Sequence, residues 1–266
     1  MLSIMSRLFF LSIMLFASTV NATTSETTDE TAWPALKQHY FGDKIIHVAE
    51  PEMLQLEAPK RAEDAAVVPI RISSNLTPTE TAYIQRLHLF IDNNPMPYSA
   101  NFLLSPKLGE IDIATRVRVD RYTPIRAIAE MNDGRLYMVS DYIKATGGCS
   151  APAGKDPSAA MARLGKMQLR MRPVVPGDMT PVQLIISHPN NSGLQIDQAS
   201  RGYIPPHYVE KIDIRVDDES LIQLESGISI SEDPSIRFMF TPEKSGTLSV
   251  DVTDSKGGNF TLNKSF

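Results

Sequence analysis

Cysteine is nearly absent from this 266-residue chain, because Cys149 is the only one. A disulfide joins two cysteines, so none can form within the chain. An excess of basic residues is absent as well, since 26 lysines and arginines stand against 31 aspartates and glutamates, for a formal net charge of −5. This mildly acidic balance gives no reason to expect nucleic acid or an anionic membrane as a partner.

Long hydrophobic runs are confined to the N-terminus. Arg7 is followed by an apolar run over residues 8–17, and the small residues Val20 and Ala22 precede a predicted cleavage point. The run is shorter than the roughly 20 residues that a membrane-spanning helix needs. We therefore predict a cleaved secretory signal over residues 1–22 and a disordered leader over the polar residues 23–31. The mature protein is expected to be exported, with no membrane partner.

The segment around Cys149 consists of small residues. Gly147 and Gly148 precede the cysteine, and the sequence SAPAG follows it at residues 150–154. Glycine loosens the backbone and small neighbours leave a sulfur accessible, so we predict that Gly147 and Gly148 form a flexible arm that presents Cys149 to solvent. The alternative is a small buried hydrophobe without a reactive role. Export favours the functional interpretation, because an unpaired thiol in an oxidising compartment tends to oxidise or cross-link.

Most of the chain after residue 31 has the alternating pattern of short β-strands. A short helix is expected over residues 33–41, where Trp33, Leu36, Tyr40 and Phe41 share one helical face. Expected strands follow at residues 66–72, 87–91, 111–113, 116–120, 125–131, 136–143, 167–171, 182–187, 212–216, 221–224, 228–230, 236–240 and 248–252, with a last strand ending at residue 266.

Two turns and one linker divide these strands. Residues 132–134 (NDG) are typical of a tight hairpin, and residues 217–220 (DDES) of a second one. Residues 147–163 contain the predicted arm and a linker rich in alanine, proline, glycine and serine. Many short strands without intervening helices predict an all-β fold. We expect two immunoglobulin-like β-sandwich domains, at residues 32–146 and 164–266.

The histidines do not have the spacing of a catalytic or metal site. His188 and His207 each lie beside a proline in a loop, where structural hydrogen bonding explains them better than a metal ion or a general base. His39, His47 and His88 are scattered among apolar neighbours and indicate nothing more specific. A glycine-rich phosphate loop and a nucleophile elbow are also missing from the sequence. The sequence thus predicts a protein that is not an enzyme and that needs neither a cofactor nor a metal.

Five blocks in the first half, ending at Cys149, resemble the SoxY family. They are residues 65–72 (AAVVPIRI), 90–95 (FIDNNP), 114–119 (ATRVRV), 127–134 (AIAEMNDG) and 146–149 (TGGC). The resemblance implies an immunoglobulin-like domain whose cysteine covalently holds sulfur intermediates while periplasmic enzymes act on them. On this resemblance Cys149 is the attachment residue, and Gly147 and Gly148 belong to the arm.

Five blocks in the second half resemble the SoxZ family, the non-covalent partner of SoxY. They are residues 188–193 (HPNNSG), 204–209 (IPPHYV), 231–234 (SEDP), 246–250 (GTLSV) and 254–257 (DSKG). The order of the two halves is similar to that of a fused SoxYZ carrier and implies pairing of the domains within one chain. By association, the fused group is linked to periplasmic quinoprotein dehydrogenases that depend on pyrroloquinoline quinone. The arm here departs from SoxY because it is internal rather than a chain terminus.

Three hypotheses follow from the sequence. The first is a periplasmic carrier that holds a sulfur-containing or other electrophilic group on Cys149 and presents it to partner enzymes. The second is a non-covalent accessory module of a quinoprotein dehydrogenase, in which the thiol is dispensable. The third is a soft-metal carrier that uses Cys149 with Met167, Met171 or histidines, although the two methionines are more simply explained by packing.

Overall fold

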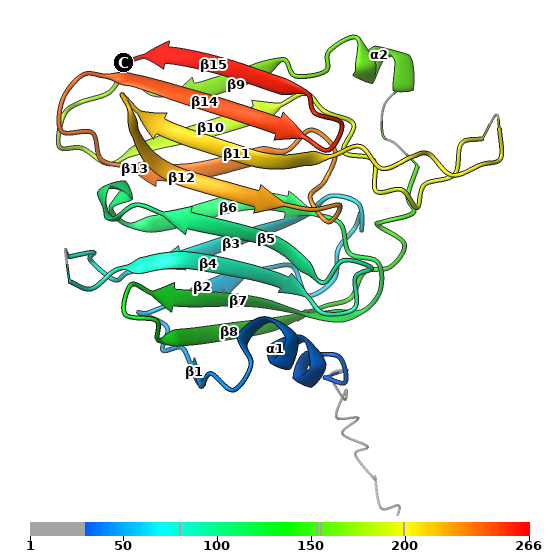
Figure 1. Ribbon diagram of the computed structural model, residues 1–266, viewed down its shortest axis with the longest axis horizontal. Coiled ribbons are helices and arrows are strands. Elements are labelled where there is room, and N and C mark those ends of the chain that lie inside the picture. The colour runs from blue at the N-terminus through cyan, green and yellow to red at the C-terminus, as the bar shows by residue number, and fades with distance from the viewer. Residues whose placement is uncertain (1–29, 80, 153, 155, 199) are drawn as a thin grey trace, which may run out of the picture.

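The computed structural model describes residues 30–79, 81–152, 154, 156–198 and 200–266. The predicted signal peptide and most of the predicted leader lie outside the described residues. In the part that is described, no helix has both the length and the apolar character needed to cross a bilayer. Nearly all regular structure is β-strand, so the predicted all-β fold class is confirmed (Figure 1).

The first half of the chain contains one helix, a short 3-10 turn and eight strands. In order they are α1 (Trp33–Phe41), β1 (Ile46–Val48), β2 (Gln55–Glu57), β3 (Val68–Ser74), β4 (Ile84–Ile91), β5 (Tyr98–Leu104), η1 (Pro106–Leu108), β6 (Ile111–Val117), β7 (Thr123–Met131) and β8 (Leu136–Ile143). The second half contains α2 (Pro157–Met161), β9 (Met167–Met171), β10 (Thr180–Ile186), β11 (Val209–Val216), β12 (Glu219–Ser226), β13 (Ser235–Phe240), β14 (Thr247–Asp254) and β15 (Asn259–Ser265).

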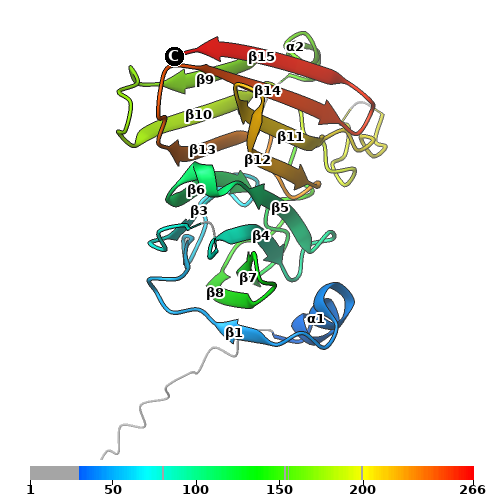
Figure 2. The ribbon, with the colours of Figure 1, turned by 60° about the vertical axis from the view of Figure 1, so that its left-hand side comes forward.

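Both halves contribute strands to the same two sheets. One sheet has nine strands in the order β1-β8-β7-β4-β5-β12-β11-β14-β15, and the other has six in the order β2-β3-β6-β13-β10-β9. The halves meet where β5 pairs antiparallel with β12, from Leu104 opposite Ile222 to Ala100 opposite Ser226. In the second sheet β13 pairs with β6. The two predicted sandwiches are therefore joined edge to edge, as the stacked strands of Figures 1 and 2 show.

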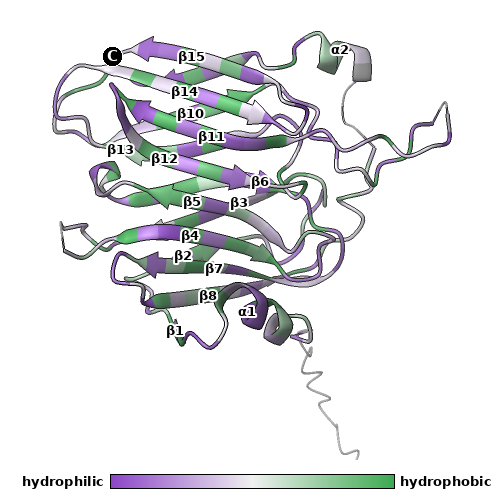
Figure 3. Ribbon diagram, in the orientation of Figure 1, coloured by the Kyte–Doolittle hydropathy of each residue, from purple (hydrophilic) through white to green (hydrophobic). Residues whose placement is uncertain are grey.

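Alternation of apolar and polar residues drives the packing of the two sheets. In β6, β10 and β14 every second residue is buried, and Figure 3 shows the matching alternation of hydropathy along the strands. One hydrophobic cluster contains side chains of both halves, such as Phe102 and Ile113 from the first and Leu224 and Phe238 from the second. Full burial of each such side chain stabilises the folded state by about 1.5–3 kcal/mol. The core is thus continuous across the domain boundary.

Helix α1 covers the outer face of the nine-stranded sheet. Its Phe41 packs in a second cluster with Phe90, Ile128 and Leu136, and Trp33 packs against that cluster. The centroids of the Trp33 and Phe90 rings lie 5.7 Å apart in an edge arrangement. The helix ends at a glycine with φ of 57°, a conformation that L side chains rarely adopt. The predicted helix and its aromatic docking face are confirmed.

The shared core predicts that the two halves unfold together. Phe102 is fully buried in β5 and lies opposite Leu224 of β12. Phe102→Ala should lower the free energy of unfolding by about 3–5 kcal/mol, because it leaves a cavity at the boundary of the two halves. Urea unfolding followed by fluorescence of Trp33, the single tryptophan, and by far-ultraviolet circular dichroism should give coincident transitions.

The control for this prediction is Phe102→Leu, which keeps most of the side-chain volume. It should lower the free energy of unfolding by about half as much as Phe102→Ala. Two separate transitions in the wild type, one for each half, would contradict a shared core.

Candidate functional site

The backbone around Cys149 is docked against the first half of the chain. The N–H of Gly147 donates to the carbonyl of Asp120 at 2.7 Å, and the N–H of Gly148 donates to that of Val119 at 3.0 Å. A Cβ on Gly148 would lie 2.0 Å from the carbonyl oxygen of Ala65 and 2.7 Å from that of Val119. Gly148 is therefore required for close packing in this docked conformation, and the mobility predicted for the two glycines stays a prediction.

Cys149 is buried, so the predicted presentation of its thiol to solvent is wrong. Its exposed fraction is 0%. The pKa of the thiol is raised to about 12, chiefly by burial and in part by the negative charge of Asp120, while the positive charge of Arg118 acts in the opposite direction. The sulfur is consequently a neutral thiol at neutral pH in this conformation. The small residues beside Cys149 let the segment pack tightly against the rest of the protein. They therefore favour burial of the thiol rather than its exposure.

The second half of the chain closes over the same segment. Ser192 donates a hydrogen bond from its hydroxyl to the carbonyl of Cys149, and the amide of Gln195 donates to the carbonyl of Ala151 at 3.1 Å. Both side chains belong to the loop between β10 and β11. Because that loop comes from the second half, Cys149 lies at the junction of the two halves.

Arg118 bridges the two halves beside Cys149, and the sequence analysis did not single it out. It follows β6, is 2% exposed, and donates through Nη1 to the carbonyl of Gly148 and through Nη2 to that of Asn190, each at 3.3 Å. Its Nε is buried without a hydrogen-bond partner among the described residues. Burial is the largest cause that lowers the pKa of the guanidinium, and ionisation of the Cys149 thiol would oppose this shift.

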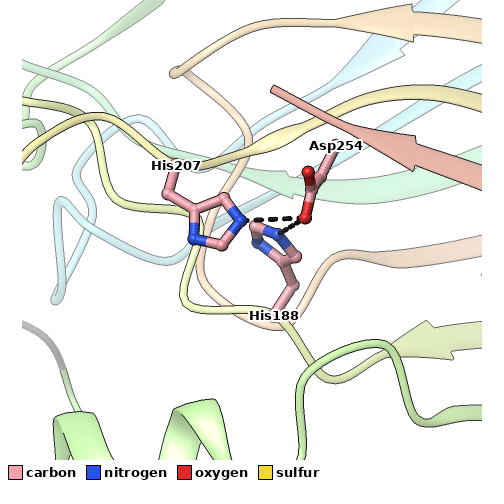
Figure 4. A group of neighbouring side chains, drawn as sticks. All are labelled: His188, His207 and Asp254. Carbon is pink, nitrogen blue, oxygen red and sulfur yellow. Dashed lines mark hydrogen bonds and ion pairs between the residues drawn. The ribbon is translucent and has the colours of Figure 1, made fainter. Parts of the chain in front are cut away.

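His188, His207 and Asp254 converge in the second half (Figure 4). Nε2 of His207 lies 2.8 Å from Oδ2 of Asp254, and Nε2 of His188 lies 3.4 Å from the same oxygen. All three are buried, and their nearest ligand-type atoms lie within 4.8 Å of one another, a spacing that could hold a metal ion. The sequence analysis named both histidines but did not connect them with Asp254, which is far from them in the chain.

Hydrogen bonding favours a structural role for this cluster. The N–H of Asn190 donates to Nδ1 of His188 at 3.0 Å, so the ring proton of neutral His188 is on Nε2, where it points at Asp254. To coordinate a metal ion, this nitrogen would have to lose its proton and the hydrogen bond to Asp254. The arrangement therefore agrees with the predicted structural hydrogen bonding of His188 and His207.

The cluster also positions the loop that covers Cys149. Asn190 donates from its side chain to the carbonyl of Ile230 and accepts from the N–H of Val209. The carbonyl of the same asparagine accepts from Arg118. The histidine cluster is thus connected through Asn190 to the cysteine segment.

The remaining predicted candidates lie elsewhere. His39 and His47 are exposed, whereas His88 is buried and lies within hydrogen-bond distance of Tyr98 and Glu130. Met167 and Met171 lie in the edge strand β9 and pack against the core, as the packing interpretation predicts.

Gly148→Ala is expected to undock the cysteine segment. The added methyl group would overlap backbone carbonyls that cannot move easily, so the segment must shift. We expect the reaction of Cys149 with Ellman's reagent in the folded protein to accelerate by at least about tenfold, since exposure also lowers the thiol pKa.

The matched control is Gly147→Ala, at a position that has φ of 79° and open space around a Cβ atom. Backbone strain in this variant should lower the free energy of unfolding by about 1–2 kcal/mol, and the reaction should accelerate less than in Gly148→Ala. Equal rates for Gly148→Ala and wild type would contradict the docked arrangement.

Acid should destabilise the protein partly through His188. Burial is the largest cause that lowers its pKa from 6.5 to about 4, and the charge of His207 adds to the effect. Between these two pH values the unfolded chain binds the proton and the folded chain does not, so the free energy of unfolding falls as the pH decreases from about 6.5 to about 4. At neutral pH His188 is uncharged in both states, so this loss of stability is absent there.

His188→Gln tests this assignment, because glutamine can still donate an N–H to Asp254 but does not titrate. The loss of stability between pH 7 and pH 5, measured by urea unfolding, should shrink by roughly 2 kcal/mol. His47→Gln, at an exposed position in β1, is the control and should leave the loss unchanged. The assignment is wrong if both variants retain the wild-type pH dependence.

Several solved structures are similar to parts of this chain. Among solved structures, the sulfur carrier protein SoxY from Chlorobium limicola f thiosulfatophilum is similar at 22% identity and a TM-score of 0.36, over 43% of this chain and 91% of that one. A superoxide reductase (neelaredoxin) from Ignicoccus hospitalis has 18% identity and a TM-score of 0.31, over 35% of this chain and 79% of its own. Fibronectin(III)-like modules of Clostridium thermocellum CbhA have 12% identity and a TM-score of 0.22, over 80% and 91% of the two chains.

Two family models match successive parts of the chain, while no curated protein matches it. The model described as sulfur oxidation protein SoxY matches residues 37–149, and the model described as sulphur oxidation protein SoxZ matches residues 169–265. The first match ends at the buried cysteine, and the second covers the half that closes over it. The chain is therefore a SoxY domain followed by a SoxZ domain, and it belongs to the sulfur-oxidation carrier family as a fused SoxY–SoxZ protein.

Proposed function

We propose that this protein is a periplasmic carrier that holds a sulfur-containing or other electrophilic group covalently on Cys149. The observation that carries the proposal is the position of Cys149, on a short segment that both domains contact. The family assignment supports it, because the SoxY match ends at residue 149. Partner enzymes would supply the chemistry, and the carrier itself would not be an enzyme.

The docked conformation is proposed to be a protected resting state. The segment is held by hydrogen bonds from Gly147, Gly148, Arg118, Ser192 and Gln195. Such bonds contribute about 0.5–1.5 kcal/mol each, so undocking would cost on the order of 5 kcal/mol. At that cost roughly one molecule in several thousand is undocked at any moment, which is enough to let a partner enzyme capture the open form.

Undocking would also activate the thiol. The pKa of about 12 in the docked state arises mainly from burial. Exposure to water removes this cause, and the pKa should fall toward the ordinary value of about 8.5. Because the thiolate is the reactive form, exposure and nucleophilicity would increase together. A carrier with this property is inert when closed and reactive when a partner opens it.

The partners are proposed to be periplasmic enzymes that act on the bound group. The sequence motif of a secretory signal supports the compartment. The two family matches support enzymes of a sulfur-oxidation system as partners. A periplasmic quinoprotein dehydrogenase is a further proposed partner, and it rests on the resemblance of the sequence to fused SoxYZ carriers alone.

One observation favours a second candidate function. The complete burial of Cys149 is what a structural cysteine would show. On this alternative the fusion is a non-covalent accessory module of a periplasmic enzyme, and the thiol only packs at the domain junction. The two candidates differ in whether the sulfur is ever modified.

Intact-protein mass spectrometry of the chain purified from its native host separates these candidates. The carrier proposal predicts an added mass that a thiol reductant removes, and that maps to Cys149. Cys149→Ser should lack the adduct and should fail to restore growth of a deletion strain on reduced sulfur or on alcohols. The substrate that supports the difference identifies the pathway. An unmodified cysteine in the host protein, together with full rescue by Cys149→Ser, would establish the accessory role and overturn the carrier proposal.

A further inference from the structure

The loop between β10 and β11 has two exposed apolar side chains toward its outer end. Ile196 is 52% exposed and Tyr203 is 72% exposed, and the two residues lie opposite each other in an isolated antiparallel bridge. Residues that are opposite each other in such a bridge present their side chains on the same face. In Figure 1 this loop projects beyond the ends of the two sheets. The pair therefore forms a small apolar surface that is open to solvent, unlike apolar residues scattered singly.

Backbone hydrogen bonds tie the two sides of this loop together as a hairpin, here called the β10–β11 hairpin. Asn191 and His207 exchange a pair of these bonds, at 2.8 and 3.0 Å. Further out, the N–H of Ile204 donates to the carbonyl of Gln195 at 2.8 Å. Because Gln195 directly precedes Ile196, a displacement of the apolar pair moves Gln195 with it. The hairpin would turn about its Asn191–His207 end.

The opposite face of the same hairpin holds the cysteine segment. Gln195 is fully buried, and its side chain donates to the carbonyl of Ala151 and accepts from the N–H of Ser192. Ser192 in turn donates from its hydroxyl to the carbonyl of Cys149. Successive residues of an extended chain point to opposite faces, which is why Gln195 is buried and Ile196 is exposed. The apolar surface and the contacts that cover the thiol are thus one residue apart in the sequence.

Charge near the tip indicates what kind of surface the hairpin fits. Arg201 is exposed and forms no ion pair within the described part of the chain. Asp197 is half-buried, and it accepts from the hydroxyl of Ser200 at 3.0 Å. The positive charge is therefore the one that is available beside the apolar pair. Aromatic residues and arginine are enriched in protein–protein interfaces, and the formal net charge of −5 disfavours an anionic membrane as the occupant.

We propose that Ile196, Tyr203 and Arg201 form the docking surface for a partner enzyme, and that docking turns the β10–β11 hairpin away from the cysteine segment. This rests on the proposed carrier function and deepens it, because it names the surface that the enzyme recognises. The partner has an apolar pocket with a carboxylate at its rim. Recognition and exposure of the thiol are then coupled, since the contacts made by Ser192 and Gln195 are lost when the hairpin moves.

The test measures exposure of Cys149 in the presence of a periplasmic extract. The extract comes from native-host cells that lack this protein, grown on reduced sulfur or on alcohols, and it is dialysed to remove small substrates. Alkylation of Cys149 in the purified, tagged protein by iodoacetamide is timed by intact mass, with and without extract. The extract should raise the rate for the wild type at least about tenfold, because docking removes two of the hydrogen bonds that hold the segment. An ultrafiltrate without proteins should have no effect.

Substitutions in the apolar pair should weaken this acceleration. At a limiting amount of extract, Tyr203→Ala and Ile196→Ala should each reduce it at least about fivefold, because few residues carry most of the energy of an interface. Tyr203→Phe keeps the ring and should keep the acceleration. The matched control is Val175→Ala, which shortens an apolar side chain of 55% exposure in the loop between β9 and β10 and should behave like the wild type. Each rate is expressed relative to the same variant without extract.

Arg201→Gln tests the charge of the surface. Added salt should reduce the acceleration of the wild type, because it screens the attraction between Arg201 and a carboxylate of the partner. In Arg201→Gln the acceleration should be smaller and nearly independent of salt.

Two results would overturn the docking surface. One is no acceleration of the wild type by either extract, and the other is equal acceleration of the wild type and both alanine variants. If the alkylation rate instead rises with the concentration of the purified protein alone, the surface joins two copies of this chain, and docking of a partner enzyme is wrong.

Failure here is distinguishable from failure of the carrier function. The experiment measures exposure of the thiol and needs no bound group. A reducible host adduct on Cys149, together with equal acceleration of Tyr203→Ala and the wild type, would overturn only the docking surface. Acceleration that depends on Tyr203, in a protein whose host form has no adduct, would retain the docking surface and overturn the carrier function.

Discussion

The antiparallel pairing of β5 with β12 is the interaction on which the rest of the structure depends. It makes one nine-stranded sheet from the strands of two domains, and the pairing of β13 with β6 does the same in the second sheet. Because both sheets continue through the boundary, the two domains have a fixed relative position. That position brings Ser192 and Gln195 of the SoxZ domain onto the cysteine segment of the SoxY domain. The edges that each domain would otherwise expose are paired with each other.

The cysteine segment shows how glycine can serve packing rather than mobility. Gly148 approaches the carbonyl oxygens of Ala65 and Val119 so closely that no side chain would fit. This contact fixes the backbone on one side of Cys149, and Ser192 fixes it on the other. The result is a buried, neutral thiol on a segment that Arg118 also contacts.

Local chemistry allowed much of the fold to be predicted from the sequence. The hairpin at residues 132–134 is present, with Gly134 at φ of 85° between β7 and β8. Strand β5 was missed, because its polar Ser99 and Asn101 are buried and break the expected alternation. Asn101 is satisfied by Glu225 of the other domain, a contact that no local pattern contains. The strand predicted at residues 228–230 was wrong, since Ile230 forms only an isolated bridge with Val117.

The site was predicted less completely, for the same physical reason. The sequence drew attention to Cys149 and predicted structural hydrogen bonding for His188 and His207. However, burial of the thiol depends on Ala65 and Val119, and the meeting of His188, His207 and Asp254 depends on how loops and β14 come together. Arg118 occupied a position in an alternating strand pattern that gave no sign of its burial. Long-range contacts decide all of these features, and a single sequence does not display them.

The central claim is that the cysteine segment opens without unfolding of the protein. The most direct measurement is the rate of alkylation of Cys149 by iodoacetamide in the native protein, as urea is raised from zero toward the unfolding transition. The account predicts an alkylation rate far above that allowed by global unfolding, with almost no dependence on urea at low concentrations, because local undocking exposes little surface. A rate that follows global unfolding throughout, with the full urea dependence of the unfolding transition, would contradict it.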